Sequence, residues 1–439
     1  MIDKEKFMKY LLLGVFWLST SFGFFAYEFL NHGEITTKVV MACEFVVMVF
    51  GLALMRKFTD FAILFSYLII SIVSTIVVNH IPWPVYINGS RDFFGFLFVV
   101  PLLRWYLAPG RRNVFKPMID RQLYYWLVLQ AFCITWQFLR YGAGDACGGS
   151  MGNGASGYVS FLIYAVSFYL LIQEWDFDNY VSSFKKNWRL ILLLYPTFLN
   201  ETKVSFILIL AYFILLLKFD KRLLIRLAYI IPAGIAGVVL LAYTYVAATG
   251  QEADKFTPEY FAQYFYGRDM DLDINVDAAL MLQDGDYDID PSEWWVEDIP
   301  RVGKLVLIGP IIATTPGGSW LGAGVGQFKG EKGFEITEFA KENMWVLQGS
   351  KPWVFSMFVQ MGFLGLIWGM AVLLRNIYIR IGVPGQRMLV SRIHLLLLLD
   401  FLLILLYNDL WRIMPFCLIV FYLAMGVRLS ANKYVTEGV

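Results

Sequence analysis

Runs of about 20 mostly apolar residues recur along the chain, and they constrain its fold more than any other feature. The run from Phe61 to Asn79, for example, contains no charged residue. A bilayer requires helices of this length, because its hydrocarbon core is about 30 Å thick. The sequence predicts twelve spans, near residues 9–30, 37–55, 60–80, 93–108, 121–139, 158–175, 189–200, 203–218, 227–248, 352–374, 393–408 and 411–428. The pair 189–200 and 203–218 forms either two full crossings or two half-crossings that meet inside a cavity.

The composition supports a polytopic membrane protein. Hydrophobic residues make up 58% of the chain and charged residues only 16%, whereas soluble domains carry about 25% charged residues. These values exclude a disordered chain and an ordinary cytosolic enzyme, and the net charge of +1 gives no basic field for nucleic acid. The four cysteines form no CxxC pair and the three histidines are scattered. We therefore expect no disulfide framework, no metal site and no cofactor.

The distribution of lysine and arginine predicts the orientation. These residues concentrate in one set of connections, such as Arg111–Arg121 and Lys218–Arg226, and cytoplasmic loops carry such an excess. Both chain termini then lie in the cytoplasm. Three features fall on the outer side: the glycine-rich loop Gly142–Gly157, the Asn200–Lys203 junction and the long hydrophilic segment 249–351.

The expected fold is thus an all-α polytopic membrane protein with one long extracytoplasmic loop. Residues 1–248 are expected to form an N-terminal transmembrane bundle, and residues 352–439 the C-terminal transmembrane helices. Between them, residues 249–351 are expected to form a loop domain. Its tryptophans and short apolar runs predict short amphipathic helices that lie on the membrane–water interface.

Ionisable residues near the outer ends of the spans are candidates for chemistry, because charges in a bilayer are costly. Each cation has a simpler interpretation as an anchor that reaches the headgroups. However, several cations on the non-cytoplasmic side run against the inside bias, and together they suit an anionic, phosphorylated ligand. The set comprises Arg91, Asp92, Arg140, Glu201, Lys203, Arg301, Lys351 and Arg412.

Three further patterns lie in the expected outer segments. Carboxylates alternate from Asp284 to Asp290 as in calcium loops, but the other positions of such a loop are missing, which favours a solvated acidic loop. The loop Gly142–Gly157 is expected to be very flexible, and serves either as a connector or as a segment that adapts to a substrate. In the compact motif Gly322–Phe328, the glycines permit tight turns and close approach to a ligand.

Three segments, in this order, resemble the O-antigen polymerase/ligase superfamily. Leu199–Lys203 resembles the family's Ser-Arg at the outer start of a span, with Lys203 in the Arg position. Arg301 followed by Leu321–Phe328 resembles the family's Arg and its later glycine motif, and Gln360–Gly365 resembles the opening of the next span. Lys351 stands where the ligases carry His, which favours a polymerase over a lipid A-core ligase.

The resemblance implies a metal-independent, inverting membrane glycosyltransferase of the GT-C type in the bacterial inner membrane. It would polymerise undecaprenyl-pyrophosphate-linked repeat units of an O-antigen, capsule or exopolysaccharide. Its partners would be the lipid-linked glycan donor and acceptor, the bilayer and a chain-length regulator. Lys203, Arg301 and Arg412 would hold the pyrophosphate, and Glu201 or a neutral Lys351 would accept the hydroxyl proton. Further substrate contacts are expected from Arg91, Arg140, Asn200, Gly324 and Gly326.

Other functions remain open at this point. The same chemistry serves a ligase that transfers the glycan to a lipid or protein acceptor. A lipid-linked oligosaccharide transporter would instead place charges or broken helices near the bilayer midplane in two matching halves, and the sequence has no clear half-to-half symmetry. A scaffold protein of an envelope complex would need no cluster of cations.

Overall fold

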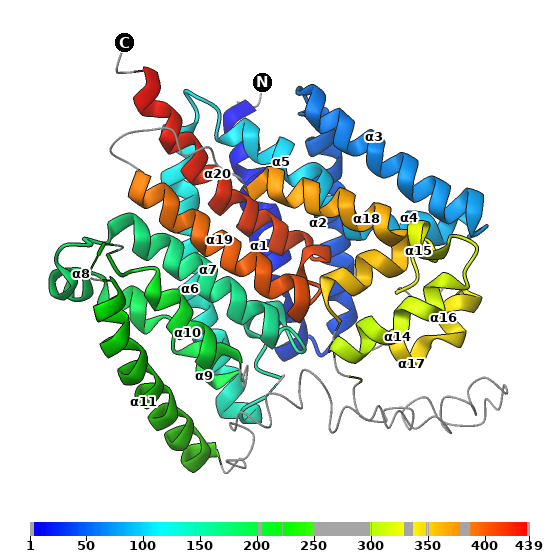
Figure 1. Ribbon diagram of the computed structural model, residues 1–439. Helices are drawn as coiled ribbons and strands as arrows, with labels where there is room; N and C mark the ends of the chain where they lie inside the picture. The colour runs from blue at the N-terminus through cyan, green and yellow to red at the C-terminus, as the bar shows by residue number, and fades with distance from the viewer. Residues whose placement is uncertain are drawn as a thin grey trace.

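The computed structural model gives an all-helical molecule over the residues that it describes, with no strand among them (Figure 1). Those residues are 4–144, 146–200, 204–218, 220–221, 223–249, 299, 301–328, 337–347, 349, 351–377 and 387–436.

The first third of the chain forms three long helices, then two short ones, then two more long ones. They are α1 (Lys4–Glu28), α2 (Gly33–Ala53), α3 (Phe58–Ile72) with its π-helical continuation η1 (Val73–Val78), α4 (Trp83–Ser90), η2 (Arg91–Phe93), α5 (Phe94–Tyr106) and α6 (Arg112–Tyr141).

The remaining elements include both long helices and short helical turns. They are η3 (Gly149–Met151), α7 (Ser156–Glu174), α8 (Tyr180–Leu192), α9 (Pro196–Leu199), α10 (Val204–Ile214), α11 (Leu223–Thr249), α14 (Arg301–Ala313), α15 (Gly318–Leu321), α16 (Glu338–Glu342), α17 (Met344–Leu347), α18 (Trp353–Ile377), α19 (Arg387–Tyr407), η5 (Leu410–Arg412) and α20 (Met414–Thr436).

Five helices in the described part of the chain are long and apolar enough to cross a membrane. They cover Lys4–Glu28, Ile35–Ala53, Phe58–Val78, Ser156–Glu174 and Trp353–Ile377. Shorter apolar stretches lie at Leu223–Gly237 and Met414–Gly426. The expectation of an all-α protein with several membrane-length helices is therefore confirmed.

The expected span at 189–200 is not one continuous helix. The segment covers the end of α8, a turn over residues 193–195 and the four-residue helix α9. Pro196 begins α9, because proline suits the first turn of a helix, where its missing N–H costs no hydrogen bond. The preceding α8 carries exposed cations and is amphipathic rather than uniformly apolar.

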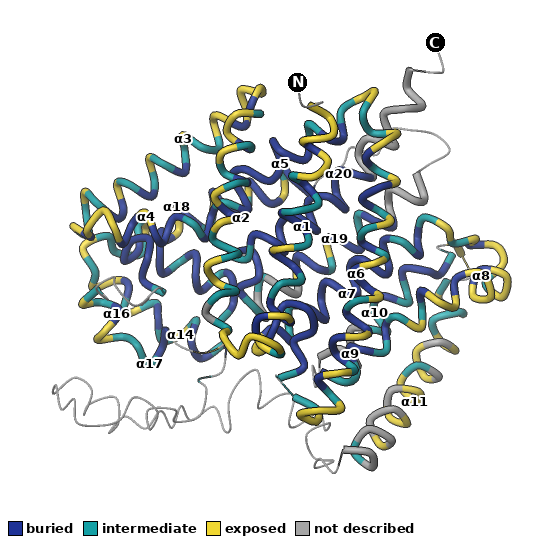
Figure 2. The backbone as a smooth tube through the Cα atoms, turned by 180° about the vertical axis from the view of Figure 1, so that it is seen from behind, coloured by how far each residue is buried: buried dark blue, intermediate teal, exposed yellow. Residues whose placement is uncertain are grey.

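The buried interior lies where α5, α7 and α20 pass between the other helices (Figure 2). Helix α5 contacts α2 on one side and α20 on the other. Phe96 of α5 stacks on Trp353 and meets Trp411 edge-on, at ring-centroid distances of 6.3 and 6.0 Å. Aromatic pairs add stability beyond the area that they bury, so this cluster fixes α5 against α18 and the connection between α19 and α20.

The two ends of the bundle differ. The chain termini lie at one end, and α14, α16 and α17 lie at the other (Figure 1). Short helices were expected between residues 249 and 351, and α14 to α17 confirm them in the described part of that segment.

The glycine-rich loop Gly142–Gly157 is packed against the bundle, contrary to the flexible loop that we expected. The backbone N–H of Gly149 donates to Oε1 of Gln137 at 2.7 Å, and that of Ser150 donates to Oε1 of Gln130 at 3.0 Å. Cys147 is fully buried. Two glutamines of α6 therefore tie down a segment whose composition alone indicates freedom.

Candidate functional site

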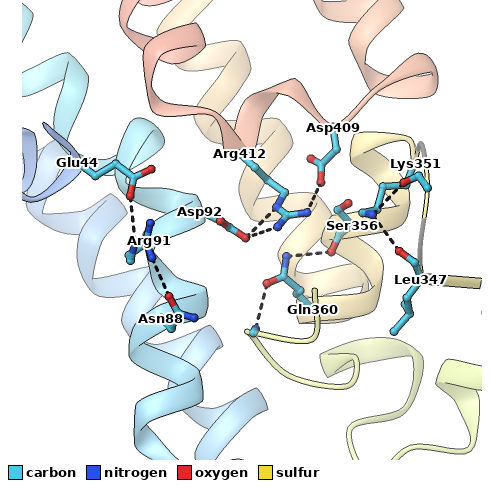
Figure 3. Close-up of polar contacts among 12 residues, drawn as sticks. Glu44, Asn88, Arg91, Asp92, Leu347, Lys351, Ser356, Gln360, Asp409 and Arg412 are labelled. Carbon is cyan, nitrogen blue, oxygen red and sulfur yellow. Dashed lines mark hydrogen bonds and ion pairs between the residues drawn. The ribbon is translucent and has the colours of Figure 1, made fainter. Parts of the chain in front are cut away.

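Arg412 lies in η5, the short connection between α19 and α20, and two carboxylates hold its guanidinium (Figure 3). Its Nε and Nη2 lie 2.8 and 2.7 Å from Oδ2 of Asp92, and its Nη1 lies 3.1 Å from Oδ2 of Asp409. Both aspartates are buried. The planar guanidinium is suited to such pairing, so Arg412 has a fixed position before any ligand binds.

A second cation, Lys351, lies close to this group. The Arg412 Cζ and the Lys351 Nζ lie 5.0 and 5.1 Å from the ring centroid of Phe328, within the usual range of a cation–π contact. The Nζ of Lys351 also donates to the carbonyl oxygens of Leu347 and Gly349, at 2.9 and 3.1 Å. Either form of Lys351 can make these two contacts, because even the neutral amine carries two N–H donors, so both of its expected roles stay open.

The glycine motif Gly322–Phe328 is held by helices on two sides. On one side, the Val325 N–H donates to the Thr75 hydroxyl at 2.8 Å. On the other, the Gly326 N–H donates to Oε1 of Gln360 at 3.3 Å. The π-helical turn η1 and the start of α18 thereby position Phe328, the last residue of the motif, beneath the two cations.

Gly322 and Gly362 make this packing possible. Both have positive φ, at 71° and 59°. A Cβ on Gly322 would lie 2.6 Å from the Val359 carbonyl oxygen, and one on Gly362 would lie 2.4 Å from the Trp320 carbonyl carbon. The glycine motif and the opening of α18, two segments of the family resemblance, thus form one packed unit.

The two glycines expected to contact substrate are closely packed in the same way. A Cβ on Gly324 would lie 2.5 Å from the Ile81 side chain, and one on Gly326 would lie 2.8 Å from Val85. Gly326 also faces Gly89, where a Cβ would lie 2.4 Å from the Gly326 Cα. These contacts give both glycines a packing role, while the chain's own atoms occupy the space beside them.

Arg301 is the first residue of α14 and is buried, as is Lys304 one turn later. Further along α14, Ile308 and Ile312 belong to the same apolar core as Phe355 of α18. This core fixes α14 against the beginning of α18, the helix that follows Lys351. The structure thereby brings Arg301 to the same end of the bundle as Lys351.

The other residues that were expected to contact substrate form ion pairs or hydrogen bonds within the bundle. Arg91 pairs with Glu44 at 3.0 Å and donates to Oδ1 of Asn88 at 2.9 Å, next to Asp92 in sequence. The half-exposed Arg140 pairs with Glu28 at the end of α1, at 2.9 Å. The Asn200 amide is buried and donates to the Ser156 carbonyl at 3.1 Å and the Ser160 hydroxyl at 2.6 Å. Asn200 thus fastens α9 to α7.

Several expected features lie outside the described residues. They are Glu201, Lys203 and the acidic run Asp284–Asp290. Within the described residues, no three His, Cys, Asp or Glu side chains gather into a cluster that could hold a metal ion.

Asp409 belongs to the site although the sequence did not single it out. It stands just after an expected span, at 393–408, and three residues before Arg412. A carboxylate three residues before an arginine, between two apolar runs, was the pattern in the sequence that could have indicated this pair. Burial raises the pKa of its carboxyl, although the nearby Arg412 and Lys351 and the Ser356 hydroxyl oppose the shift. The buried carboxylate is therefore more basic than one in water.

Comparison of the sequence with protein-family models and with curated proteins finds no match.

Proposed function

We propose that the chain is a membrane glycosyltransferase that polymerises undecaprenyl-pyrophosphate-linked oligosaccharide repeat units. It would act on the outer face of the bacterial inner membrane, with twelve spans, a GT-C-like arrangement and both termini in the cytoplasm. The observation that carries the proposal is the meeting of Lys351 and Arg412 at Phe328, the last residue of the glycine motif. Cations held in place before the ligand arrives suit a reaction in which negative charge develops on a leaving pyrophosphate.

The reaction is a substitution at the anomeric carbon of the donor. The acceptor hydroxyl oxygen bonds to that carbon, while the bond from the carbon to the pyrophosphate oxygen breaks. The leaving pyrophosphate keeps the electron pair, and the hydroxyl proton passes to a carboxylate. Lys203, Arg301 and Lys351 neutralise the leaving group. Arg412 already makes three N–H contacts with aspartates, so it orders the site and offers its remaining donors.

Two carboxylates are available for the proton. Glu201 adjoins the expected outer start of α10. Asp409 is buried beside Arg412, and its raised pKa suits proton acceptance. Lys351 lies beside Arg412 at the Phe328 ring, so we give it the pyrophosphate contact rather than the role of base. We therefore assign the proton to Asp409 or Glu201 and the pyrophosphate contact to Lys351.

The test measures polymer length and rate in membranes supplied with lipid-linked repeat units. Lys351→Ala, Arg301→Ala and Lys203→Ala should each lower the rate by about 10²–10³, because each removes one preorganised donor. Lys341→Ala is the matched control, since Lys341 is exposed on α16 in the same segment. Unchanged polymer from all three variants, at normal protein levels in the membrane, would remove the chemical basis of the proposal.

A transporter of lipid-linked oligosaccharides is the second candidate, and one observation favours it. Asp400 is buried within α19, where it accepts a hydrogen bond from the Tyr212 hydroxyl of α10. Buried ionisable residues inside a bundle often mark a transport path. Asp400→Asn separates the two functions: a transporter should lose translocation, whereas the polymerase should keep its rate on repeat units already at the outer face.

A further inference from the structure

Helix α8 (Tyr180–Leu192) is fastened to the end of the bundle and projects from it (Figure 1). At its start, the Asn179 side chain accepts from the Ser182 N–H at 3.0 Å and caps the helix. The Tyr180 hydroxyl accepts from the Lys218 N–H at 2.8 Å, which ties α8 to the residues after α10. The helix thus has a fixed place at the level where α7 and α10 end.

The surface of α8 divides into three sectors. One sector faces the protein and holds the buried residues Ser183, Asn187 and Leu190. A second is an exposed apolar stripe, and a third is basic. The apolar stripe consists of Val181, Phe184, Trp188 and Leu192, whose exposed fractions are 66, 53, 51 and 56%. The basic sector consists of Lys185, Lys186 and Arg189, all exposed.

The spacing keeps these sectors apart. A helix turns about 100° per residue, so positions 181, 184, 188 and 192 fall on one face. Lys185 and Arg189 follow one another at a spacing of four along the edge of that face. Figure 2 shows α8 as a largely exposed helix at the rim of the molecule, far from α14 and α16. An apolar face bordered by cations is the pattern of a helix that lies in a membrane surface.

We propose that α8 lies in the membrane–water interface and binds the headgroups of anionic lipids. Phe184 and Trp188 reach the boundary between headgroups and acyl chains, and tryptophan is favoured at this interface. Lys185 and Arg189 contact lipid phosphates. The inference is independent of the glycosyltransferase proposal, because it depends only on the faces of α8 and its attachment to membrane helices.

The charged residues of α8 favour anionic lipid, rather than another protein surface, as the ligand of this helix. Lys186 already has an acidic partner, Glu174, at 3.1 Å. Within the described residues, no ion pair joins Lys185 or Arg189 to an acidic side chain, and the Arg189 guanidinium lies 5.7 Å from the Trp188 ring centroid. Arg189 is therefore held beside the residue that enters the lipid. Helix α8 also follows α7, a membrane-length helix, after a short turn.

The experiment places a fluorescent label at Val181→Cys in the full-length protein, reconstituted in nanodiscs. The four native cysteines are buried, so the label reports from α8 alone. The discs contain phosphatidylglycerol and phosphatidylcholine, with brominated acyl chains on one lipid or the other. Both brominated lipids should quench the label. Phosphatidylglycerol should quench as if enriched about tenfold over its mole fraction, since each basic residue near an anionic surface adds to lipid affinity.

A charge-matched pair of variants isolates the two cations. Lys185→Gln with Arg189→Gln should reduce the phosphatidylglycerol enrichment to the mole fraction. Lys38→Gln with Lys341→Gln removes the same charge from exposed positions on α2 and α16 and should leave the enrichment unchanged. High salt should abolish the enrichment in the unaltered protein, because it screens surface charges.

Three outcomes would overturn the inference. Absence of quenching by both lipids would place α8 outside the membrane. Quenching by each lipid in proportion to its mole fraction, in the unaltered protein, would remove the anionic preference. Cross-linking of two copies through position 181, with protection from both quenchers, would make the apolar stripe an interface between copies of the chain.

Discussion

Asp92 and Arg412 are 320 positions apart in sequence, yet Oδ2 of Asp92 lies 2.8 Å from Nε and 2.7 Å from Nη2 of Arg412. One residue belongs to η2, before α5, and the other to η5, before α20. Helices α5 and α20 contact each other directly. The pair therefore fastens together the ends of two helices that form the centre of the bundle.

Loss of either partner should destabilise the protein. Arg412→Ala should lower the free energy of unfolding by about 3 kcal/mol, because it leaves two buried carboxylates without their cation. Asp92→Ala should lower it by less, because Asp409 still pairs with Arg412. The double variant should lose less than the sum, since the two side chains interact directly. Thermal unfolding of the purified protein in detergent measures all three values.

Lys186→Ala supplies the control for this pair. Lys186 forms an ion pair with Glu174 at the end of α7, and 62% and 59% of the two side chains are exposed. Exposed pairs contribute about 0–1 kcal/mol. A loss from Arg412→Ala no larger than that from Lys186→Ala would contradict the structural role of the buried pair.

The packing of the glycine motif gives a second prediction, from two glycines in one turn. Gly318 and Gly322 both have positive φ, but a Cβ on Gly318 meets nothing within 4 Å. Gly318→Ala should therefore cost only the left-handed backbone penalty, about 1–2 kcal/mol. Gly322→Ala should cost clearly more, because its Cβ would lie 2.6 Å from the Val359 carbonyl oxygen.

Thermal unfolding of the two variants compares these costs directly. The same preparations also report on the site, because the motif positions Phe328 below Lys351 and Arg412. Gly322→Ala should reduce the polymerisation rate more than Gly318→Ala does. Equal effects of both substitutions on stability would mean that the motif tolerates a side chain at position 322.

The positions of the long helices could be predicted from the sequence, because runs of apolar residues mark where these helices begin and end. The span expected at 352–374 matches α18, and that at 60–80 matches α3 with η1. Segment 189–200 differs because its N-terminal part belongs to an amphipathic helix that ends before Pro196. Hydropathy over a window cannot separate such a helix from a short span, because it averages over all faces.

The site was predictable only in part, because its contacts join distant segments. Arg412 and Lys351 stood out as charges at the ends of spans. Asp409 did not, since its importance comes from burial against Arg412. Likewise, the glycine motif was recognisable, but its packing against Gly362 requires the fold. Gln137 of α6 accepts a hydrogen bond from the Gly149 N–H. The composition of the glycine-rich loop does not reveal this contact, because its partner lies on another element.

The raised pKa of Asp409 predicts a pH dependence of the proposed reaction. A base must be ionised, so activity should fall as the pH drops through the pKa of Asp409. Burial raises that pKa, against the opposing influence of Arg412, Lys351 and Ser356. The acidic limb of the rate profile should therefore lie above the value near 3.9 of a solvated aspartate.

Asp409→Asn tests this assignment. The variant should lose most of the rate, and its residual rate should no longer show the acidic limb. Glu342→Gln is the control, because Glu342 is an exposed carboxylate on α16. An unchanged acidic limb in Asp409→Asn would assign the proton to another group, such as Glu201.

The last prediction concerns the orientation of the bundle in the membrane. Lys186 on α8 and Lys341 on α16 are both exposed, so single cysteines at these positions should react with a membrane-impermeant thiol reagent. The four native cysteines are buried and should stay silent. Because lysine and arginine favour the cytoplasmic side, Lys341→Cys should be labelled in intact cells, and Lys186→Cys only after the membrane is opened. Labelling of Lys186→Cys in intact cells would reverse the orientation and place the Lys351–Arg412 site in the cytoplasm, where a reaction on the outer face is impossible.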